Sequence, residues 1–341
     1  MTTDSGFVLA ADIGGTNARF ALFTTGGGVR MAAGTQLPTA SFASFHGLVE
    51  AAARELAEAT GWSGESGAPD SVHFPGTTAA ALAVAGPVER GLFCQPPNID
   101  YVMDLEALPV GLLPGASILL NDFAAQAHGC RLFGEQRSLS VLPGRMDPAR
   151  TQAVVGPGTG LGKAALVPVS CAGGGEYVVC GSEGGHAAFP FNGPEERRFQ
   201  EFVQAEVAEP FARWETVVSG SGLALLHRYH TGQSVASPAE AAAALGPGSP
   251  VAEWFARFLG RACRDYVLDV LATGGLFISG GVAARNPMLL EHPAFAREFR
   301  TSPAHAGLLS AVPVRLVADQ QVGLWGAASR ALALVGERQG A

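Results

Sequence analysis

The chain has 341 residues, of which 48% are hydrophobic and 15% charged, so it can form two packed domains and is not a largely disordered protein. Its formal net charge of −8 argues against a general nucleic-acid binder, because neutralising phosphates needs basic surface. No apolar stretch reaches membrane-spanning length, and residues 1–6 lack the basic and apolar parts of a secretory signal. We therefore expect a cytoplasmic protein without membrane or nucleic-acid partners. The scattered cysteines indicate reduced thiols; they are Cys94, Cys130, Cys171, Cys180 and Cys263.

The first predicted element is a hairpin over residues 7–23. Apolar runs at 7–10 and 20–23 enclose the sequence Asp12-Ile13-Gly14-Gly15-Thr16-Asn17. Backbone N–H groups freed by such a turn attract phosphate, and glycine allows the anion a close approach. Asp12 can hold a metal ion, or water on a metal ion, beside that phosphate. The hairpin setting excludes a Walker A loop and a Rossmann fingerprint, since both of those open a helix.

A helix is expected within 44–60, a surface loop over 62–75 and a strand over 79–85. A second short strand, 117–120, ends at Asn121-Asp122, and residues 124–129 are expected to be helical. Asp122 is either an N-cap for that helix or a general base that accepts the proton of an attacking hydroxyl. Its place favours the second role, because open α/β sheets bind ligands at strand ends.

Residues 134–150 are rich in turns and are expected to join two domains. The strand–turn–strand pattern then recurs, with runs at 153–155 and 164–169 around the turn 156–162, which contains Gly158 and Thr159. Two copies of one device predict two similar halves that face each other across a cleft. The predicted division of roles puts Gly14–Thr16 and Gly158–Thr159 around the phosphates.

The remaining elements are a helix after Asn192, a helix over 250–273, a third glycine pair at Gly280-Gly281, a strand over 314–317 and a helix reaching residue 332. The glycine pair is expected near a nucleoside. Before these elements, glycines expose Glu183 and His186, an acceptor and donor pair suited to the vicinal hydroxyls of a sugar. Glu215 is either a further acceptor or a solvated helix charge.

Taken in order, these motifs resemble those of bacterial glucokinases of the non-ROK type, which belong to the sugar-kinase branch of the actin, Hsp70 and hexokinase superfamily. The resemblance spans residues 7 to about 332. The motifs are 12–19, 120–123, 158–162, 183–186 and 279–281. The cysteine-rich zinc motif of ROK proteins is absent after His186. The implied fold is α/β, a two-domain actin-like ATPase (ribonuclease H-like) fold with an interdomain active-site cleft. The expected domains are 1–132 plus 319–341 (small) and 133–318 (large).

The resemblance also implies roles for single residues. Asp122 would be the base for the glucose 6-hydroxyl, and the sugar hydroxyls would be held by Asn98, Asn121, Glu183, His186 and Glu215. Asn98 precedes Tyr101 where the family's motif has Trp. The phosphates and Mg²⁺ would be met by Asp12, Gly14, Gly15, Thr16 and Asn17, with Asp12 holding the metal through water. Gly158 and Thr159 would lie on the other side of the phosphates, and Gly280 and Gly281 beside the nucleoside.

The expected reaction transfers a phosphoryl group from ATP to D-glucose, with Mg²⁺ bridging phosphates, in a protein that forms a homodimer. Sugar binding is expected to close the domains and exclude water. Two alternatives stay open from the sequence. One is a kinase for another hexose, such as mannose, fructose or N-acetylglucosamine. The other is a sensor that binds nucleotide and sugar without catalysis.

Overall fold

The computed structural model describes residues 6–26, 28–61, 73–74, 76–169, 176–246 and 248–339. By internal packing, residues 1–132 and 321–341 form one compact unit and residues 133–320 form a second. This division places Asp319 and Gln320 in the second unit. Asp319 pairs with Arg137 at 3.0 Å, and Gln320 accepts a hydrogen bond from Arg285, so both belong to the second unit. Cys171 and most of the predicted loop 62–75 lie outside the described residues.

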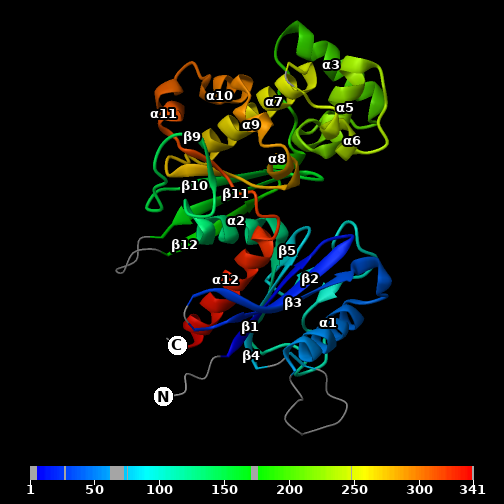
Figure 1. Ribbon diagram of the computed structural model, residues 1–341, viewed down its shortest axis with the longest axis vertical. Coiled ribbons are helices and arrows are strands. Elements are labelled where there is room, and N and C mark those ends of the chain that lie inside the picture. The colour runs from blue at the N-terminus through cyan, green and yellow to red at the C-terminus, as the bar shows by residue number, and fades with distance from the viewer. Residues whose placement is uncertain are drawn as a thin grey trace. The chain divides into compact units, whose positions relative to one another are not determined.

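The first unit is a sheet with helices on both faces (Figure 1). Its elements are β1 (Phe7–Ile13), β2 (Asn17–Thr24), β3 (Arg30–Pro38), η1 (Thr39–Ser41), α1 (Phe45–Thr60), β4 (Thr77–Val84), β5 (Val88–Glu89), β6 (Phe93–Cys94), β7 (Met103–Asp104), β8 (Ser117–Asn121), α2 (Asp122–Phe133) and α12 (Val322–Gln339). The main sheet has the order β3-β2-β1-β4-β8. Strands β1, β4 and β8 run parallel, whereas β2 and β3 are antiparallel to their neighbours.

The continuous apolar sequence of β1 follows from burial on both of its faces. Successive side chains of a strand point to opposite sides. Leu9 and Ala11 accordingly pack with Leu48 and Leu56 of α1, whereas Val8 and Ala10 join the cluster that contains residues of α12. A strand covered on both faces shows no polar alternation, which is typical of the parallel part of a sheet.

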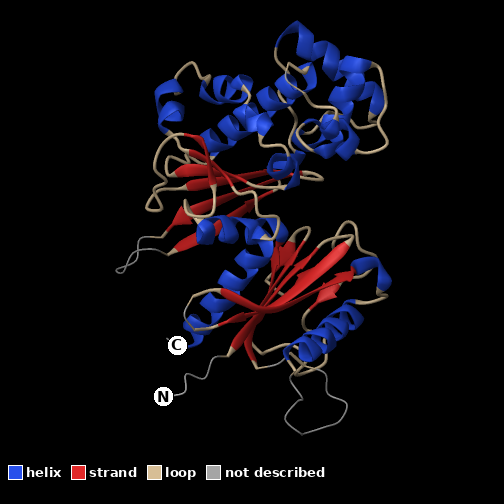
Figure 2. Cartoon of the chain, in the orientation of Figure 1, coloured by secondary structure: helices blue, strands red, loops and turns tan. Residues whose placement is uncertain are grey.

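The second unit is a sheet packed against a larger set of helices (Figure 2). Its elements are β9 (Leu139–Leu142), β10 (Gln152–Pro157), β11 (Leu161–Pro168), β12 (Tyr177–Ser182), η2 (Gly184–His186), α3 (Gly193–Glu206), α4 (Trp214–Val217), α5 (Gly220–Thr231), α6 (Pro238–Ala243), α7 (Pro250–Asp269), β13 (Gly275–Ile278), α8 (Gly281–Arg285), α9 (Met288–Glu291), α10 (Pro293–Arg300), α11 (Ala306–Ala311) and β14 (Val314–Leu316).

The two units share one strand plan. The second sheet has the order β12-β11-β10-β13-β14-β9. Apart from β9, it repeats the first: an antiparallel hairpin, a third antiparallel strand, then two parallel strands on the other side of the opening strand. The predicted recurrence of a strand–turn–strand device therefore reflects two similar sheets. The alternating apolar residues of β10, β13 and β14 build the second core together with α7.

Several local predictions need correction. The segment 134–150 is not only a junction, because it contains β9, which pairs with β14 at the sheet edge. Helix α7 ends at Asp269 rather than at residue 273, since Gly275 already begins β13. Asn192 stands before α3, but its side chain makes no capping hydrogen bond. None of the helices in the described residues combines the length and apolar character needed to cross a bilayer.

Candidate functional site

The turn between β1 and β2 is held in shape by its neighbours in the first unit. The N–H of Gly14 donates to the carbonyl of Asn17 at 3.0 Å. Thr39 of η1 braces the turn twice, because its hydroxyl donates to the carbonyl of Gly14 at 2.7 Å and its N–H donates to that of Thr16 at 3.0 Å. The side chain of Asn17 accepts from Gln36 of β3. The candidate phosphate turn is therefore preorganised, with hydrogen bonds on both sides of Gly15.

Asp12 stands opposite Arg19 across the hairpin, and their side chains approach to 3.6 Å. Burial raises the pKa of Asp12, and the guanidinium of Arg19 opposes that rise. Among the described residues no three His, Cys, Asp or Glu side chains gather as metal ligands. A single carboxylate at the edge of a phosphate turn fits Mg²⁺, which keeps several waters and takes other ligands from substrate phosphates.

Asp122 lies at the same sheet edge as Asp12. The pairing of β1, β4 and β8 aligns Ile13 with Val84 and Val84 with Asn121, so the carboxyl ends of three parallel strands meet there. Asn121 caps α2, since its Oδ1 accepts from the N–H groups of Phe123 and Ala124, while Oδ1 of Asp122 shares the N–H of Phe123 at 2.8 Å. Its Nδ2 donates to the carbonyl of Gly86 at 3.1 Å, which leaves one amide hydrogen for a ligand. Asp122 follows this fixed residue directly.

Asn98, the candidate sugar residue of the first unit, packs against the phosphate turn. A Cβ placed on Gly15 would lie 3.1 Å from the Cβ of Asn98 and 3.2 Å from its carbonyl oxygen. Tyr101 donates from its hydroxyl to the carbonyl of Thr39 at 3.5 Å, in the segment that braces the turn. The first unit thus brings the predicted residues for phosphate and for sugar into contact.

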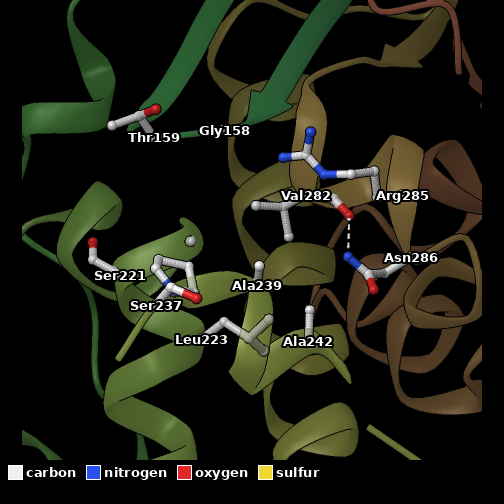
Figure 3. Close-up of a pocket in the computed structure, with 12 residues that line it drawn as sticks. Gly158, Thr159, Ser221, Leu223, Ser237, Ala239, Ala242, Val282, Arg285 and Asn286 are labelled. Atoms are coloured by element: carbon white, nitrogen blue, oxygen red, sulfur yellow. Dashed lines mark hydrogen bonds between the residues drawn. The ribbon is translucent and has the colours of Figure 1, made fainter. Parts of the chain in front are cut away.

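In the second unit, the turn between β10 and β11 opens into a cavity of about 410 Å³. The N–H of Gly158 donates to the carbonyl of Gly160, and the N–H of Gly220 at the start of α5 donates to the carbonyl of Gly158. Figure 3 shows residues from the turn, α5, α6 and α8 around this cavity. They are Gly158, Thr159, Gly220, Ser221, Leu223, Ser237, Pro238, Ala239, Ala242, Val282, Arg285 and Asn286.

The lining of this cavity divides into two chemical parts. One end has the N–H-rich start of α5 and the hydroxyls of Thr159 and Ser221, groups that suit an anion. The other end is formed by small apolar side chains of α6 and by Val282, with Arg285 and Asn286 beside it (Figure 3). Gly280 adopts a φ of +99°, and a Cβ there would lie 2.7 Å from the carbonyl oxygen of Pro157. The glycine pair therefore lets α8 begin directly against the β10–β11 turn.

The three candidate sugar residues of the second unit lie together. Nε2 of His186 is 3.6 Å from Oε2 of Glu183, and its Nδ1 is 3.4 Å from Oε1 of Glu215. The side chains of His186 and Glu183 are 55% and 67% exposed, so both are accessible to a ligand. Glu215 also adjoins the phosphate turn, because a Cβ on Gly160 would lie 2.6 Å from its Oε2.

Sequence reasoning missed two groups. Arg213 and Glu209 form an ion pair beside His186 and Glu215, and nothing in the spacing of the chain distinguishes them from surface charges. The hydrogen bond from Arg213 lowers the pKa of Glu209. The apolar end of the cavity was also missed, because its side chains from α6 are alanines, which give no motif. Pro238 followed by the alanine-rich segment 239–243, which contains Glu240, could have indicated a short helix.

The fold is that of the actin-like sugar kinases. A solved glucokinase from an Antarctic psychrotroph matches 95% of this chain and 98% of its own, with a TM-score of 0.76 and 28% identity. A curated glucokinase of Xanthomonas euvesicatoria is 32% identical over 97% of both chains. A glucokinase of Pseudomonas aeruginosa is 33% identical over 94% of this chain and 93% of the relative.

The family model of glucokinases matches residues 9–334. This chain therefore belongs to the glucokinase family, as the resemblance of its motifs predicted. Enzymes of this family are phosphotransferases that use ATP and act on an alcohol group of a sugar, so the chain is an enzyme of that class.

Proposed function

We propose that the protein transfers the γ-phosphoryl group of ATP to the 6-hydroxyl of D-glucose, giving glucose 6-phosphate and ADP. The observation that carries this proposal is the occurrence, in one chain, of an aspartate at the shared end of three parallel strands and of a Glu–His–Glu cluster beside a phosphate turn. A nucleotide binder alone needs no such set of hydroxyl partners. The full-length similarity to curated glucokinases supports the same activity.

Asp122 is proposed as the general base. Its carboxylate takes the proton of the 6-hydroxyl while the sugar oxygen bonds to the γ-phosphorus and the bond from that phosphorus to the leaving oxygen of ADP breaks. Asn121 fixes the backbone at the start of α2 through its two capping bonds, so the position of Asp122 is set before substrate arrives. Asn98, Glu183, His186 and Glu215 then bind the remaining hydroxyls of the same sugar, with the free amide hydrogen of Asn121.

The nucleotide is proposed to lie with its base and ribose in the 410 Å³ cavity and its phosphates towards Thr159 and the start of α5. That volume is within the range typical of small-molecule sites. Gly14, Gly15, Thr16 and Asn17 of the other turn are proposed to bind the phosphates, and Asp12 to hold Mg²⁺ through water. The metal ion would neutralise charge on the phosphates during transfer.

Three further expectations belong to this proposal. A cytoplasmic location agrees with the chain's composition, and its charge of −8 supports small-molecule rather than nucleic-acid partners. A homodimer, implied by the family resemblance, is tested by sedimentation equilibrium. Closure on glucose is tested by small-angle scattering, in which glucose should reduce the radius of gyration.

The test of the reaction is the variant Asp122→Asn. We expect turnover to fall by about 10²–10⁴-fold, because the hydroxyl proton loses its acceptor. Glucose binding, measured by calorimetry, should change little. The matched control is Glu58→Gln on the exposed face of α1, which also converts a carboxylate to an amide and should keep full activity. Near wild-type turnover of Asp122→Asn would contradict the role of Asp122.

The substrate is tested separately with a coupled assay that compares glucose with mannose, fructose and N-acetylglucosamine. A higher kcat/KM for any of the other sugars would replace glucose in the proposal. Nucleotide binding without sugar-stimulated release of ADP would instead favour a sensor.

A further inference from the structure

Arg213 touches two of the three candidate sugar residues of the second unit, although no motif includes it. Its Nη1 lies 2.9 Å from Nδ1 of His186 and also donates to Oε1 of Glu215. On the other side, its Nε donates to Oε2 of Glu209 at 3.1 Å and its Nη2 donates to the second oxygen of that carboxylate. The guanidinium is thus held by a two-point contact with Glu209 and points its remaining edge at the sugar residues.

The backbone places Arg213 here. Residues Ala188 and Arg213 form an isolated antiparallel bridge, and the N–H of Trp214 donates to the carbonyl of Ala187 at 2.9 Å. This pairing joins the segment after η2, which carries His186, to the segment before α4, which carries Glu215. Arg213 is therefore part of the backbone pairing that brings His186 and Glu215 together.

The contact with His186 decides which ring nitrogen carries the proton. A guanidinium has five N–H donors, no acceptor, and does not lose its proton in proteins. Nδ1 of His186 must then be the acceptor of the 2.9 Å contact, since a proton on Nδ1 would face a second donor. A ring that accepts at Nδ1 carries its proton on Nε2. Its other nitrogen, near Glu183, is a donor.

We propose that Arg213 is a positioning residue for sugar recognition, which holds His186 as an Nε2–H donor and fixes the carboxylate of Glu215 beside it. This inference rests on the proposed function. With Arg213 in place, the ring of His186 offers one N–H donor and has a carboxylate on either side. Glu183 lies 3.6 Å from its Nε2, and Glu215 lies 3.4 Å from its Nδ1. Adjacent hydroxyls of a sugar each donate and accept one hydrogen bond, so they match an alternation of acceptor and donor. Without Arg213, the Nδ1–H form could turn its proton to Glu215 and leave Nε2 as an acceptor.

Kinetics test this role with Arg213→Met, which keeps much of the side-chain volume and removes every donor. We expect kcat/KM for glucose to fall roughly tenfold or more, mainly through KM, as for a lost hydrogen bond to a charged group. KM for ATP should stay within about twofold, the change typical of a substitution outside a ligand's own contacts. Arg213→Lys should recover only part of the loss, because one ammonium cannot contact Glu209 and His186 in the same fork.

Two further variants separate positioning from folding. Glu209→Gln should also weaken glucose binding, but less than Arg213→Met does. It weakens the contact that holds the guanidinium in place, and the guanidinium itself remains. Arg228→Met is the matched control, because it removes a surface Arg–Glu pair with Glu206 in the same unit, away from the cluster. It should leave both KM values unchanged. An equal loss in Arg228→Met would overturn the proposal by assigning the effect to general destabilisation.

A spectroscopic readout tests the proton position directly in the wild-type enzyme. Two-bond ¹H–¹⁵N spectra distinguish the two neutral forms of histidine, and the His186 signals are assigned by their loss in His186→Asn. We expect the Nε2–H form in the wild type and a mixture of forms in Arg213→Met. An Nδ1–H or doubly protonated ring in the wild type would overturn the proposal, while the glucose kinase assay of the same sample reports separately on the proposed function.

Discussion

The two glycine turns occupy the same place in two sheets of the same strand order, yet they carry different chemistry. The turn of the first unit follows Asp12 and is braced by Thr39. The turn of the second unit has no carboxylate within it, but it forms one wall of the 410 Å³ cavity. The two turns thus differ in their surroundings, with a carboxylate beside one and a cavity beside the other.

The two units also differ in how their cores are packed. One face of the first sheet is covered largely by alanines, and α2 and α12 cross so closely that a Cβ on Gly326 would overlap the carbonyl of Ala125. The second unit instead packs rings such as Phe199, Trp254 and Phe258 together, and its buried Arg261 lies over the rings of Phe189 and Phe258. Close backbone contact therefore stabilises one unit, whereas the other depends on large side chains and on a buried ion pair.

The largest expected effect tests this difference in packing. Arg261 is 3% exposed and donates from both terminal nitrogens to Glu196 and from Nε to Glu298. Arg261→Met should destabilise the protein by about 3–5 kcal/mol, because Glu196 then keeps only Arg257 at 3.4 Å and Glu298 only the partly exposed Arg264. Arg54→Met, which breaks an exposed i,i+4 pair with Glu50, should cost about 1 kcal/mol or less. Urea unfolding followed by circular dichroism measures both, and equal costs would contradict the distinction.

The second effect tests the chemical specialisation of the turns. Asp12→Asn removes the carboxylate proposed to hold Mg²⁺ through water, and such outer partners of a metal ion are worth about 10–100-fold in activity or affinity. The Mg²⁺ concentration that gives half-maximal rate should rise with the loss. Thr159→Ala removes one hydroxyl from the other turn, so it should raise KM for ATP roughly fivefold to tenfold. Its Mg²⁺ dependence should stay that of the wild type, and a shift as large as that of Asp12→Asn would argue against the division of roles.

Much of the candidate site could be predicted from the sequence because its residues occupy local motifs. Asp12 and Asp122 each stand at the end of an apolar run, so their presence at strand ends follows from local pattern alone. Their common edge requires the parallel pairing of β1, β4 and β8, which no local pattern predicts. The family resemblance predicted the roles of these residues, whereas the residues that surround them in space became known only from the structure.

Other parts of the site could not be predicted, because they depend on contacts between distant segments. Arg213 contacts His186, which lies 27 positions earlier in the chain. Its partner Glu209 lies four positions before it, in a segment that is not helical, so helical spacing gives no sign of the pair. The strand β9 was missed because it has only four residues, lies in a segment rich in turns, and pairs at the sheet edge with β14, which is far away in the sequence. The division of Asn121 between capping and ligand binding also becomes visible only from its three hydrogen bonds.

The smallest expected effect concerns a feature that the two turns share. In each turn, one glycine lies in close contact with a candidate sugar residue. Gly160→Ala places a Cβ 2.6 Å from the carboxylate of Glu215, at the end of a flexible side chain that can move aside. KM for glucose should therefore rise by up to about tenfold, the cost of one displaced charged hydrogen bond, with little change in stability.

In the first unit, the equivalent change is Gly15→Ala, which meets Asn98 at 3.1 Å and 3.2 Å, distances that a shift of a few tenths of an ångström relieves. Its effect on KM for glucose should be smaller, roughly twofold to threefold, because it disturbs a neutral amide rather than a carboxylate and neutral hydrogen bonds are the weaker class. Gly307→Ala in α11, where a Cβ meets nothing within 4 Å, is the control for added side-chain bulk. If Gly15→Ala weakened glucose binding more than Gly160→Ala, the sugar would depend chiefly on the first unit, and the Glu–His–Glu cluster would lose its leading role.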